Sequence, residues 1–278
     1  GNVGLPATAV VTVTPVNDAP VGIDGTIAGS EDTDLVLDAD AFGFSDPADG
    51  GAHTLASVTV ATLPAVGTLL LDGVPVEAGQ EIALADLEAG RLVYRAPDHA
   101  QGEGLTSLTF HVRDTGGTMN GGVDFDPVAR TLTIDVAAVN DAPVLVAGDT
   151  TAATITEDDV NNAGQTVAEL LGIVTDADTG THTADNGTLS GMAVTGLGGN
   201  GQWQFSLDGT TWTDVALEGG EALLLGASDR LRFVPDEENA TTATLDYRAW
   251  DRSTGARGDV VLPEGTAFSE GSGRVTLD

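Results

Sequence analysis

Apolar and polar residues alternate along short stretches of this chain, and clusters of Gly, Pro and Asp separate the stretches. Residues 57–60, 108–112 and 132–136 are examples. An alternation with a period of two places every second side chain on one face, which is the pattern of a half-buried β-strand. Short strands at even spacing predict an all-β fold of sandwiches rather than a parallel sheet covered by helices.

Local signals refine this picture. Asp72-Gly73 and Asp208-Gly209 each separate two apolar stretches, which predicts β-hairpins. A short helix is expected over residues 166–171 and a helical turn over 84–87. Residues 196–201 match the dinucleotide-binding pattern GxGxxG, but an alternating stretch follows them where that motif needs a helix. We therefore predict a glycine-rich β-hairpin loop there.

The chain also repeats itself. Val-Asn-Asp-Ala-Pro occurs at residues 16–20 and again at 139–143, each time after an alternating stretch. Further landmarks recur in the same order: Glu31 and Glu157; Asp46, Asp49 and His53 against Asp176, Asp178 and His182; Tyr94 and Asp98 against Phe233 and Asp236; Asp114 against Asp251. The predicted organisation is the last strand of a preceding repeat (1–17), one sandwich (18–140) and a second sandwich (141–278).

Composition excludes several function classes. The 278 residues include 43 Asp plus Glu but only 10 basic residues, every one of them Arg, for a net charge of −33. Without Lys there is no P-loop and no Schiff base, and without Cys there is no disulfide or thiolate site. The negative field disfavours nucleic acids and anionic membranes as partners. The chain has no apolar run long enough to span a bilayer, and its start lacks a signal peptide, so we expect a fragment of a larger protein.

The recurring acidic residues indicate a metal rather than an active site. Calcium binds six to eight oxygens from carboxylates, amides, carbonyls and water. Carboxylates that gather at loops with few cations to pair them would suit it. Any single Asp could equally be a solvated turn residue, because Asp and Asn favour turns without a metal. The four His are scattered and no nucleophile–base arrangement is present, so no enzyme is expected.

These landmarks also resemble a known family. The Val-Asn-Asp-Ala-Pro segments, the Glu-Asp boxes and the strand-end Asp114 and Asp251 resemble bacterial cadherin-like repeats. Such repeats occur in tandem in large secreted adhesins of Gram-negative bacteria, including the repeats-in-toxin class. Residues 63–94 also look like the proteoglycan-type variant. The resemblance implies tandem Greek-key β-sandwiches of the cadherin or immunoglobulin type in an elongated array, placed outside the cell.

The resemblance further implies calcium ions (Ca²⁺) at the junctions between sandwiches. Carried over residue by residue, the first junction would use Asn17, Asp18, Glu31, Asp46 and Asp114. The second junction would use Asn140, Asp141, Glu157, Asp176, Asp178 and Asp251. The first repeat has Ser45-Asp46-Pro47 where the second has Asp176-Ala177-Asp178, so the first junction is expected to hold fewer ions.

Two functions follow as hypotheses. The first is a non-enzymatic extender of an adhesin, which calcium stiffens and whose partners are the neighbouring repeats of the same chain. The alternative is a calcium-dependent module near an adhesin tip that binds a peptide or a carbohydrate. Residues 184–221, which contain Trp203 and Trp212, would be the place for such a ligand.

Overall fold

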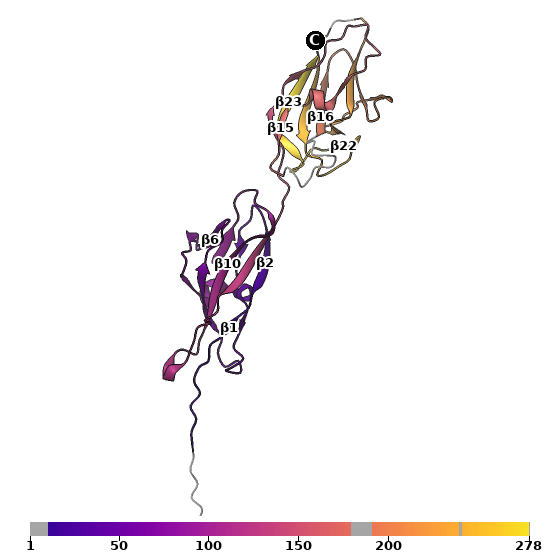
Figure 1. Ribbon diagram of the computed structural model, residues 1–278. Helices are drawn as coiled ribbons and strands as arrows, with labels where there is room; N and C mark the ends of the chain where they lie inside the picture. Colours follow the sequence, from indigo (N-terminus) through magenta and orange to yellow (C-terminus); the bar gives the residue numbers. More distant parts are fainter. Residues whose placement is uncertain (1–10, 179–190, 239–240, 278) are drawn as a thin grey trace, which may run out of the picture. The chain divides into compact units, whose positions relative to one another are not determined.

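A computed structural model describes residues 11–178, 191–238 and 241–277 of the chain (Figure 1). The internal contacts divide the chain into two units, Gly1–Val139 (unit 1) and Asn140–Asp278 (unit 2). The division falls inside the second Val-Asn-Asp-Ala-Pro segment. Each unit is built from antiparallel-rich sheets that enclose an apolar core, and this confirms the predicted all-β sandwich class.

Unit 1 has two main sheets and a small ribbon. The five-stranded sheet has the order β2 (Gly25–Ser30), β11 (Arg130–Ala137), β10 (Gly102–Asp114), β5 (Leu55–Thr62), β8 (Glu81–Ala83). The four-stranded sheet has the order β3 (Leu35–Val36), β9 (Leu92–Arg95), β6 (Thr68–Leu71), β7 (Val74–Pro75). The ribbon pairs β1 (Val21–Gly22) with β4 (Phe44–Ser45). The helical turns are η1 (Ala39–Phe42), α1 (Leu84–Glu88) and η2 (Met119–Gly121).

The core of unit 1 follows from the alternation in its strands. Leu108, Phe110 and Val112 on β10 are fully buried, and the residues between them are partly exposed. The ring of Phe110 meets that of Phe42 edge-on with the centroids 5.0 Å apart. Burying side chains of this size stabilises the sandwich by roughly 1.5–3 kcal/mol each.

Unit 2 has the same plan as unit 1, and its larger sheet has six strands instead of five. The six-stranded sheet has the order β13 (Thr150–Thr151), β23 (Phe268–Leu277), β21 (Ala243–Trp250), β16 (Gly191–Gly198), β19 (Ala222–Leu225), β22 (Val260–Val261). The four-stranded sheet has the order β14 (Gln165–Thr166), β20 (Arg230–Pro235), β17 (Gly201–Ser206), β18 (Thr213–Asp214). The ribbon pairs β12 (Val144–Ala147) with β15 (Ile173–Thr175), and α2 (Val167–Leu170) is the only helix in the described part of this unit.

The local predictions hold with one exception. Both Asp-Gly hairpins form, as β6–β7 and β17–β18, and both short helices are present. The glycine-rich loop does not close a hairpin, because β16 and β17 belong to different sheets. Gly199, which has φ +115°, carries the chain from one sheet to the other, and a Cβ there would lie 2.9 Å from Ala243. Only glycine fits at this position. A glycine-rich sequence of this kind resembles a hairpin turn, although here it connects two sheets.

In each unit the chain crosses from one sheet to the other after its second strand, β2 in unit 1 and β13 in unit 2, and the two crossings differ. In unit 1, β2 pairs in parallel with β11 along its whole length, and residues 31–34 suffice to reach β3. In unit 2, β13 is two residues long, and the longer segment 152–164 connects it to β14. No helix in the described part of the chain has both the length and the apolar character needed to cross a lipid bilayer.

Candidate functional site

The asparagine of the first Val-Asn-Asp-Ala-Pro segment is fixed to the end of strand β10. The side-chain amide of Asn17 donates to both carboxylate oxygens of Asp114, at 3.1 and 3.2 Å, and to the carbonyl of Val123 at 2.8 Å. Only 9% of Asn17 and 3% of Asp114 is exposed. Because Asp114 is the last residue of β10, the linker is attached directly to the end of a long strand of the main sheet.

The next residue of the linker is held by an acidic loop. The N–H of Asp18 donates to Oδ2 of Asp49 at 2.8 Å, and the N–H of Asp49 donates to Oδ1 of Asp46 at 3.3 Å. Asp46 is 6% exposed. The unit 1 cluster is therefore Asn17, Asp18, Asp46, Asp49 and Asp114.

Unit 2 has the same arrangement at the second linker. The amide of Asn140 donates to Oδ2 of Asp251 at 2.9 Å, and Asp251 directly follows strand β21. The N–H of Asp141 donates to Oδ2 of Asp178, whose own N–H donates to Oδ1 of Asp176 at 3.0 Å. These five residues are the unit 2 cluster. The structure thus brings together ten acidic or amide residues as two equivalent sets, and nine of them are among the calcium ligands that the family resemblance implied.

The unit 2 cluster is crowded with negative charge. Burial raises the pKa of Asp176, although a hydrogen bond from the N–H of Asp178 opposes the shift. The negative charges of Asp251, Asp178 and Asp141 raise the pKa of Asp176 further. These carboxylates are therefore close enough to repel one another, and a cation would relieve that repulsion.

Several oxygens in the clusters lack a hydrogen-bond donor. Oδ1 of Asn17, Oδ2 of Asp46 and Oδ1 of Asn140 are buried without a partner. A buried acceptor without a donor costs roughly 1–3 kcal/mol, so these atoms fit a bound cation in their chemistry. No three Asp, Glu or His side chains in the described ranges already converge as a complete metal site. Amide and backbone oxygens and water would have to complete the coordination of a calcium ion.

The structure corrects the placement of the two glutamates. Glu31 accepts from the N–H of Val139, and its own N–H donates to Ala137 at the end of β11. Strand β11 runs antiparallel to β10, so Glu31 lies at the opposite end of the sheet from Asp114. It therefore does not belong to the unit 1 cluster, although Oε2 of Glu31 is another buried oxygen without a partner.

The second acidic box follows the same rule. Glu157 is exposed and lies beyond β13, which pairs with β23 at Thr276. Asp251 lies near the other end of β23, where Trp250 pairs with Phe268. Glu157 is thus separated from the unit 2 cluster by the length of a strand. The order of the acidic residues along the two repeats did not indicate at which end of the sandwich each residue lies.

One cluster residue, Asp49, is a landmark of the repeat but was not among the expected calcium ligands. Asp49 takes the place in unit 1 that Asp178 takes in unit 2, although its spacing from the first loop aspartate is one residue longer. The signal was present, because Asp46-Pro47-Ala48-Asp49 ends in an aspartate as Asp176-Ala177-Asp178 does. The ligand assignment instead compared Ser45-Asp46-Pro47 with Asp176-Ala177-Asp178, which left Asp49 out.

The structure gives no paired tryptophan platform for a sugar. Trp203 is 4% exposed and packs against Phe233 in the core, with ring centroids 5.4 Å apart. The guanidinium of Arg232 covers the ring of Trp212 at 4.2 Å from its centroid. Part of the proposed ligand region, residues 184–190, lies outside the described residues, as does His182.

Comparisons with known proteins find similarity only at the level of structure. No family model matches the sequence, and no curated protein matches it either. Human mucin-like protocadherin EC1-2 matches over 93% of this chain and 97% of its own, at 14% identity and a TM-score of 0.42. Mouse cadherin-23 EC22-24 matches over 94% of this chain and 66% of its own, at 18% identity and a TM-score of 0.46. Drosophila N-cadherin EC1-4 matches over 94% and 49%, at 15% identity and a TM-score of 0.41.

These values are too low to transfer a function to the chain. For several of the matched structures the chain spans about half of their length or less. Function therefore has to be inferred from the two clusters themselves.

Proposed function

We propose that the chain is a structural module: two tandem β-sandwiches, stiffened by calcium, from a large extracellular adhesin of a bacterium. It catalyses no reaction, and its partners are the neighbouring repeats of the same chain. The recurrence of one arrangement in both units carries this proposal. In each unit the linker asparagine donates to a strand-end aspartate, and the next N–H donates to a loop aspartate.

The clusters serve to fix the linkers. A peptide segment outside any sheet has no ladder of hydrogen bonds and is flexible unless side chains hold it. Asn17 and Asn140 tie two such segments to the ends of strands β10 and β21. The N–H of Val139, just before the second linker, is held in addition by Glu31. Each of these contacts restrains a linker against the unit to which it is attached.

The donor set of the clusters suits calcium better than a transition metal, because it contains oxygen and no sulfur. Asn17, Asp46, Asp49 and Asp114 would hold an ion in unit 1. Asn140, Asp176, Asp178 and Asp251 would hold one in unit 2. A bound calcium ion would offset the repulsion between the carboxylates around Asp176. Extracellular calcium modules have dissociation constants of about 10⁻⁴–10⁻³ M, so such sites fill outside the cell and empty in the cytosol.

Isothermal titration calorimetry of the intact chain with CaCl₂ tests the proposal. We expect saturable binding in the range of about 0.1–1 mM and much weaker binding of Mg²⁺, which requires a rigid octahedral site. Asp114→Asn should abolish binding to unit 1 alone, and Asp251→Asn should abolish binding to unit 2 alone.

Glu157→Gln is the matched control, since Glu157 is an exposed acid outside both clusters. It should leave the titration unchanged. Equal losses in all three variants would mean that calcium binds only as a diffuse counterion, and the proposed function would then be wrong.

A further inference from the structure

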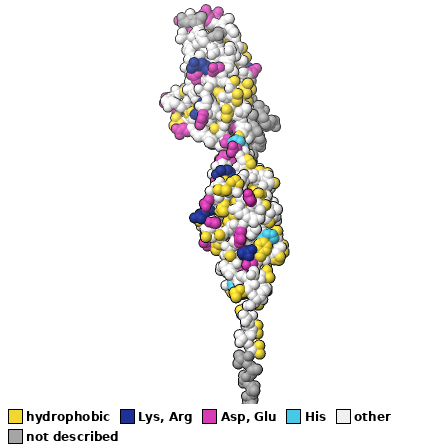
Figure 2. Space-filling view, turned by 90° about the vertical axis from the view of Figure 1, so that its left-hand side faces the viewer, with side chains coloured by type: hydrophobic (Ala, Val, Ile, Leu, Met, Phe, Trp, Pro, Cys, Tyr) yellow, Lys and Arg dark blue, Asp and Glu magenta, His cyan; other side chains and the backbone are white. Residues whose placement is uncertain are grey.

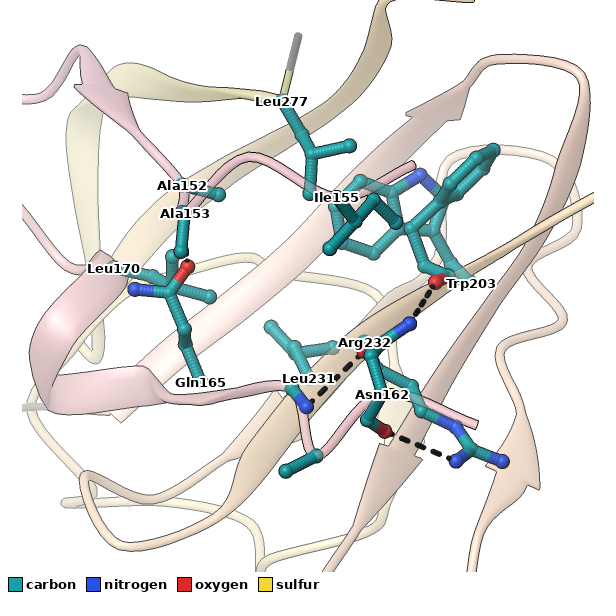
Figure 3. A pocket seen from close by; sticks show the side chains of 13 residues that line it. Ala152, Ala153, Ile155, Asn162, Gln165, Leu170, Trp203, Leu231, Arg232 and Leu277 are labelled. Carbon is teal, nitrogen blue, oxygen red and sulfur yellow. Dashed lines mark hydrogen bonds between the residues drawn. The ribbon is translucent and has the colours of Figure 1, made fainter. Parts of the chain in front are cut away.

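Unit 2 has an apolar pocket in its side wall, about 170 Å³ in volume and distinct from the acidic cluster (Figure 3). It lies under the crossing segment 152–164, between the edges of the two sheets. Trp203 and Phe233 form one wall, and Ile155, Leu231 and Leu277 contribute to the others. A dry cavity of similar size, about 150 Å³, accommodates a benzene ring in another protein.

The pocket exists because the crossing segment carries small residues. Ala152, Ala153 and Ala163 line the opening, and their methyl groups are too short to fill it. In unit 1 the short crossing leads to Leu35, whose side chain packs against the core. A Cβ placed on Gly29 would already be 3.3 Å from Leu35. The pocket at the crossing of unit 1 is polar instead, lined by Asp32, Thr33, Asp34, Arg95, Ala96 and Asp98.

A cation is fixed at the rim of the pocket. Arg232 lines it and is held in place by Oε1 of Gln204, at 2.6 and 2.8 Å, by the carbonyl of Asn162 at 3.2 Å and by the ring of Trp212. All of these partners are neutral. Among the described residues Arg232 forms no salt bridge, although acidic residues outnumber arginines by 43 to 10.

Amide groups complete the rim. Oε1 of Gln165 accepts from the N–H of Ala153, which leaves its amino group to donate to a ligand carbonyl. Asn162 donates to the carbonyl of Phe233 and accepts from the N–H of Gly164, so it anchors the wall of the pocket to strand β20. Figure 3 shows Asn162 and Arg232 on the same side of the opening.

We propose that this pocket binds the carboxyl terminus of a peptide that ends in an aromatic or branched aliphatic residue. The apolar side chain would enter the pocket between Trp203 and Ile155, the terminal carboxylate would pair with Arg232, and a peptide carbonyl would accept from Gln165. A guanidinium with fixed geometry suits a carboxylate, because it can donate two parallel hydrogen bonds. An apolar interior with a few convergent polar groups is the usual composition of a ligand pocket.

The net charge of the chain does not prevent this binding. Figure 2 shows acidic side chains spread over both units on the face drawn there. At physiological ionic strength, however, charges more than about 8 Å from a site are largely screened. The charged groups close to the rim therefore set the local field: Arg232, Arg230, which donates to the carbonyls of Ala163 and Gly164, and Asp214, which accepts from the amide of Gln204. Two of these three groups are cations.

Ligand titrations followed by NMR test the inference without reference to calcium affinity. The probes are N-acetyl-Gly-Gly-Phe as the free acid, the same peptide as its carboxamide, and N-acetyl-Gly-Gly-Ala. The free acid should bind with a dissociation constant on the order of 1 mM, as expected for a ligand of this size. The shifts should centre on the indole N–H of Trp203. The carboxamide and the alanine peptide should each bind at least tenfold more weakly.

Protein variants separate the two halves of the site. In Arg232→Gln the acid and the carboxamide should bind equally, whereas Arg232→Lys should retain part of the preference for the acid. Ala153→Trp should fill the opening and abolish binding. Thr154→Trp, an equally exposed neighbour that does not line the pocket, should leave binding intact.

Two results would overturn the inference: equal affinities of the wild-type chain for the acid and the carboxamide, or shifts that do not involve Trp203. If 3-phenylpropanoate binds as tightly as the peptide acid, the ligand is a small aromatic acid and the assignment to a peptide is wrong. Failure of calcium binding would leave all of these outcomes unchanged, so the test is independent of the proposed function.

Discussion

The two units hold their linkers in the same way but differ in their side walls. Both tie a linker to the following sandwich by the same pair of contacts, from an asparagine amide to a strand-end aspartate and from the next N–H to a loop aspartate. The side walls differ, because the crossing of unit 1 lines a polar pocket beside Arg95 and Asp98, whereas the crossing of unit 2 lines an apolar pocket beneath small residues. Features shared by repeats indicate what every repeat must do. Features of one repeat alone indicate a separate task.

The first strands after the linkers also differ. In unit 1 the N–H of Gly22 on β1 donates to the buried carboxylate of Asp126, at 2.8 Å. In unit 2 the hydroxyl of Tyr247 donates to Gly148, just after β12, and accepts from the N–H of Gly172. A charged group holds one strand and a neutral group holds the other, so the two units should respond differently to pH.

The largest predicted effect is that of calcium on thermal stability. At 10 mM CaCl₂ a site with a dissociation constant of 10⁻⁴–10⁻³ M adds about 1.4–2.7 kcal/mol. This raises Tm on the order of 5–10 °C for each unit. The unit 2 transition should shift more, because the carboxylates around Asp176 repel one another without the ion.

The melting of unit 2 can be measured separately from that of unit 1, because all three tryptophans lie in unit 2. Fluorescence melting follows unit 2 alone, and calorimetry follows both units. A fluorescence Tm that stays the same with CaCl₂ and with EGTA would contradict the prediction for unit 2.

The second prediction concerns Asp126. Burial raises its pKa, but hydrogen bonds from the N–H groups of Gly22 and Val128 and the charge of Arg130 outweigh that effect and lower it overall. The stabilisation from a lowered pKa is present above the unfolded value near 4 and is lost as the pH falls towards the folded value. Asp126→Asn should therefore cost unit 1 about 2 kcal/mol at pH 7 and progressively less below pH 4.

Tyr247→Phe in unit 2 is the matched variant. It should also destabilise its unit, by about 1 kcal/mol, but by the same amount at pH 4 and pH 7, because burial raises a tyrosine pKa that is already far above this range. Calorimetry at the two pH values distinguishes the variants. A pH-independent loss in Asp126→Asn would mean that the charge on Asp126 does not stabilise unit 1.

Much of this architecture could be predicted from local sequence. The alternation predicts the strands, Asp-Gly predicts two hairpins, and the family resemblance implies nine of the ten cluster residues. Glu31 and Glu157 could not be placed, because their position depends on the parallel pairing of β2 and β13 with strands more than 100 residues away. The pocket could not be predicted from the sequence for a related reason. Three alanines in a sequence do not show whether a neighbouring side chain covers them.

The third prediction sharpens the contrast between the clusters. Asp176→Asn removes a charge from unit 2 but keeps the oxygen that accepts from Asp178. Because burial and neighbouring charges raise the pKa of Asp176, its ionised form destabilises the folded state above pH 4. In EGTA at pH 7 the variant should be more stable than wild type by roughly 0.5–1 kcal/mol, the size of one partly exposed ion pair.

At pH 3, where Asp176 is protonated in wild type as well, the gain should disappear. With CaCl₂ the order should reverse, because the variant has lost a ligand. Fluorescence melts under these three conditions check the sign in each. A variant less stable than wild type in EGTA would show that the crowding around Asp176 carries no energetic cost.

The smallest effect is expected at the side wall of unit 2. Ala152 is 7% exposed and lines the pocket, so Ala152→Val adds two methyl groups to a space that is already there. Filling a void recovers contacts without displacing neighbours, and such changes commonly add about 0.5–1 kcal/mol. Thr154→Val, on an exposed neighbour that does not line the pocket, should change stability by less than about 0.5 kcal/mol. If Ala152→Val both stabilises unit 2 and weakens binding of N-acetyl-Gly-Gly-Phe, the small side chain at position 152 keeps the pocket open at a cost in stability.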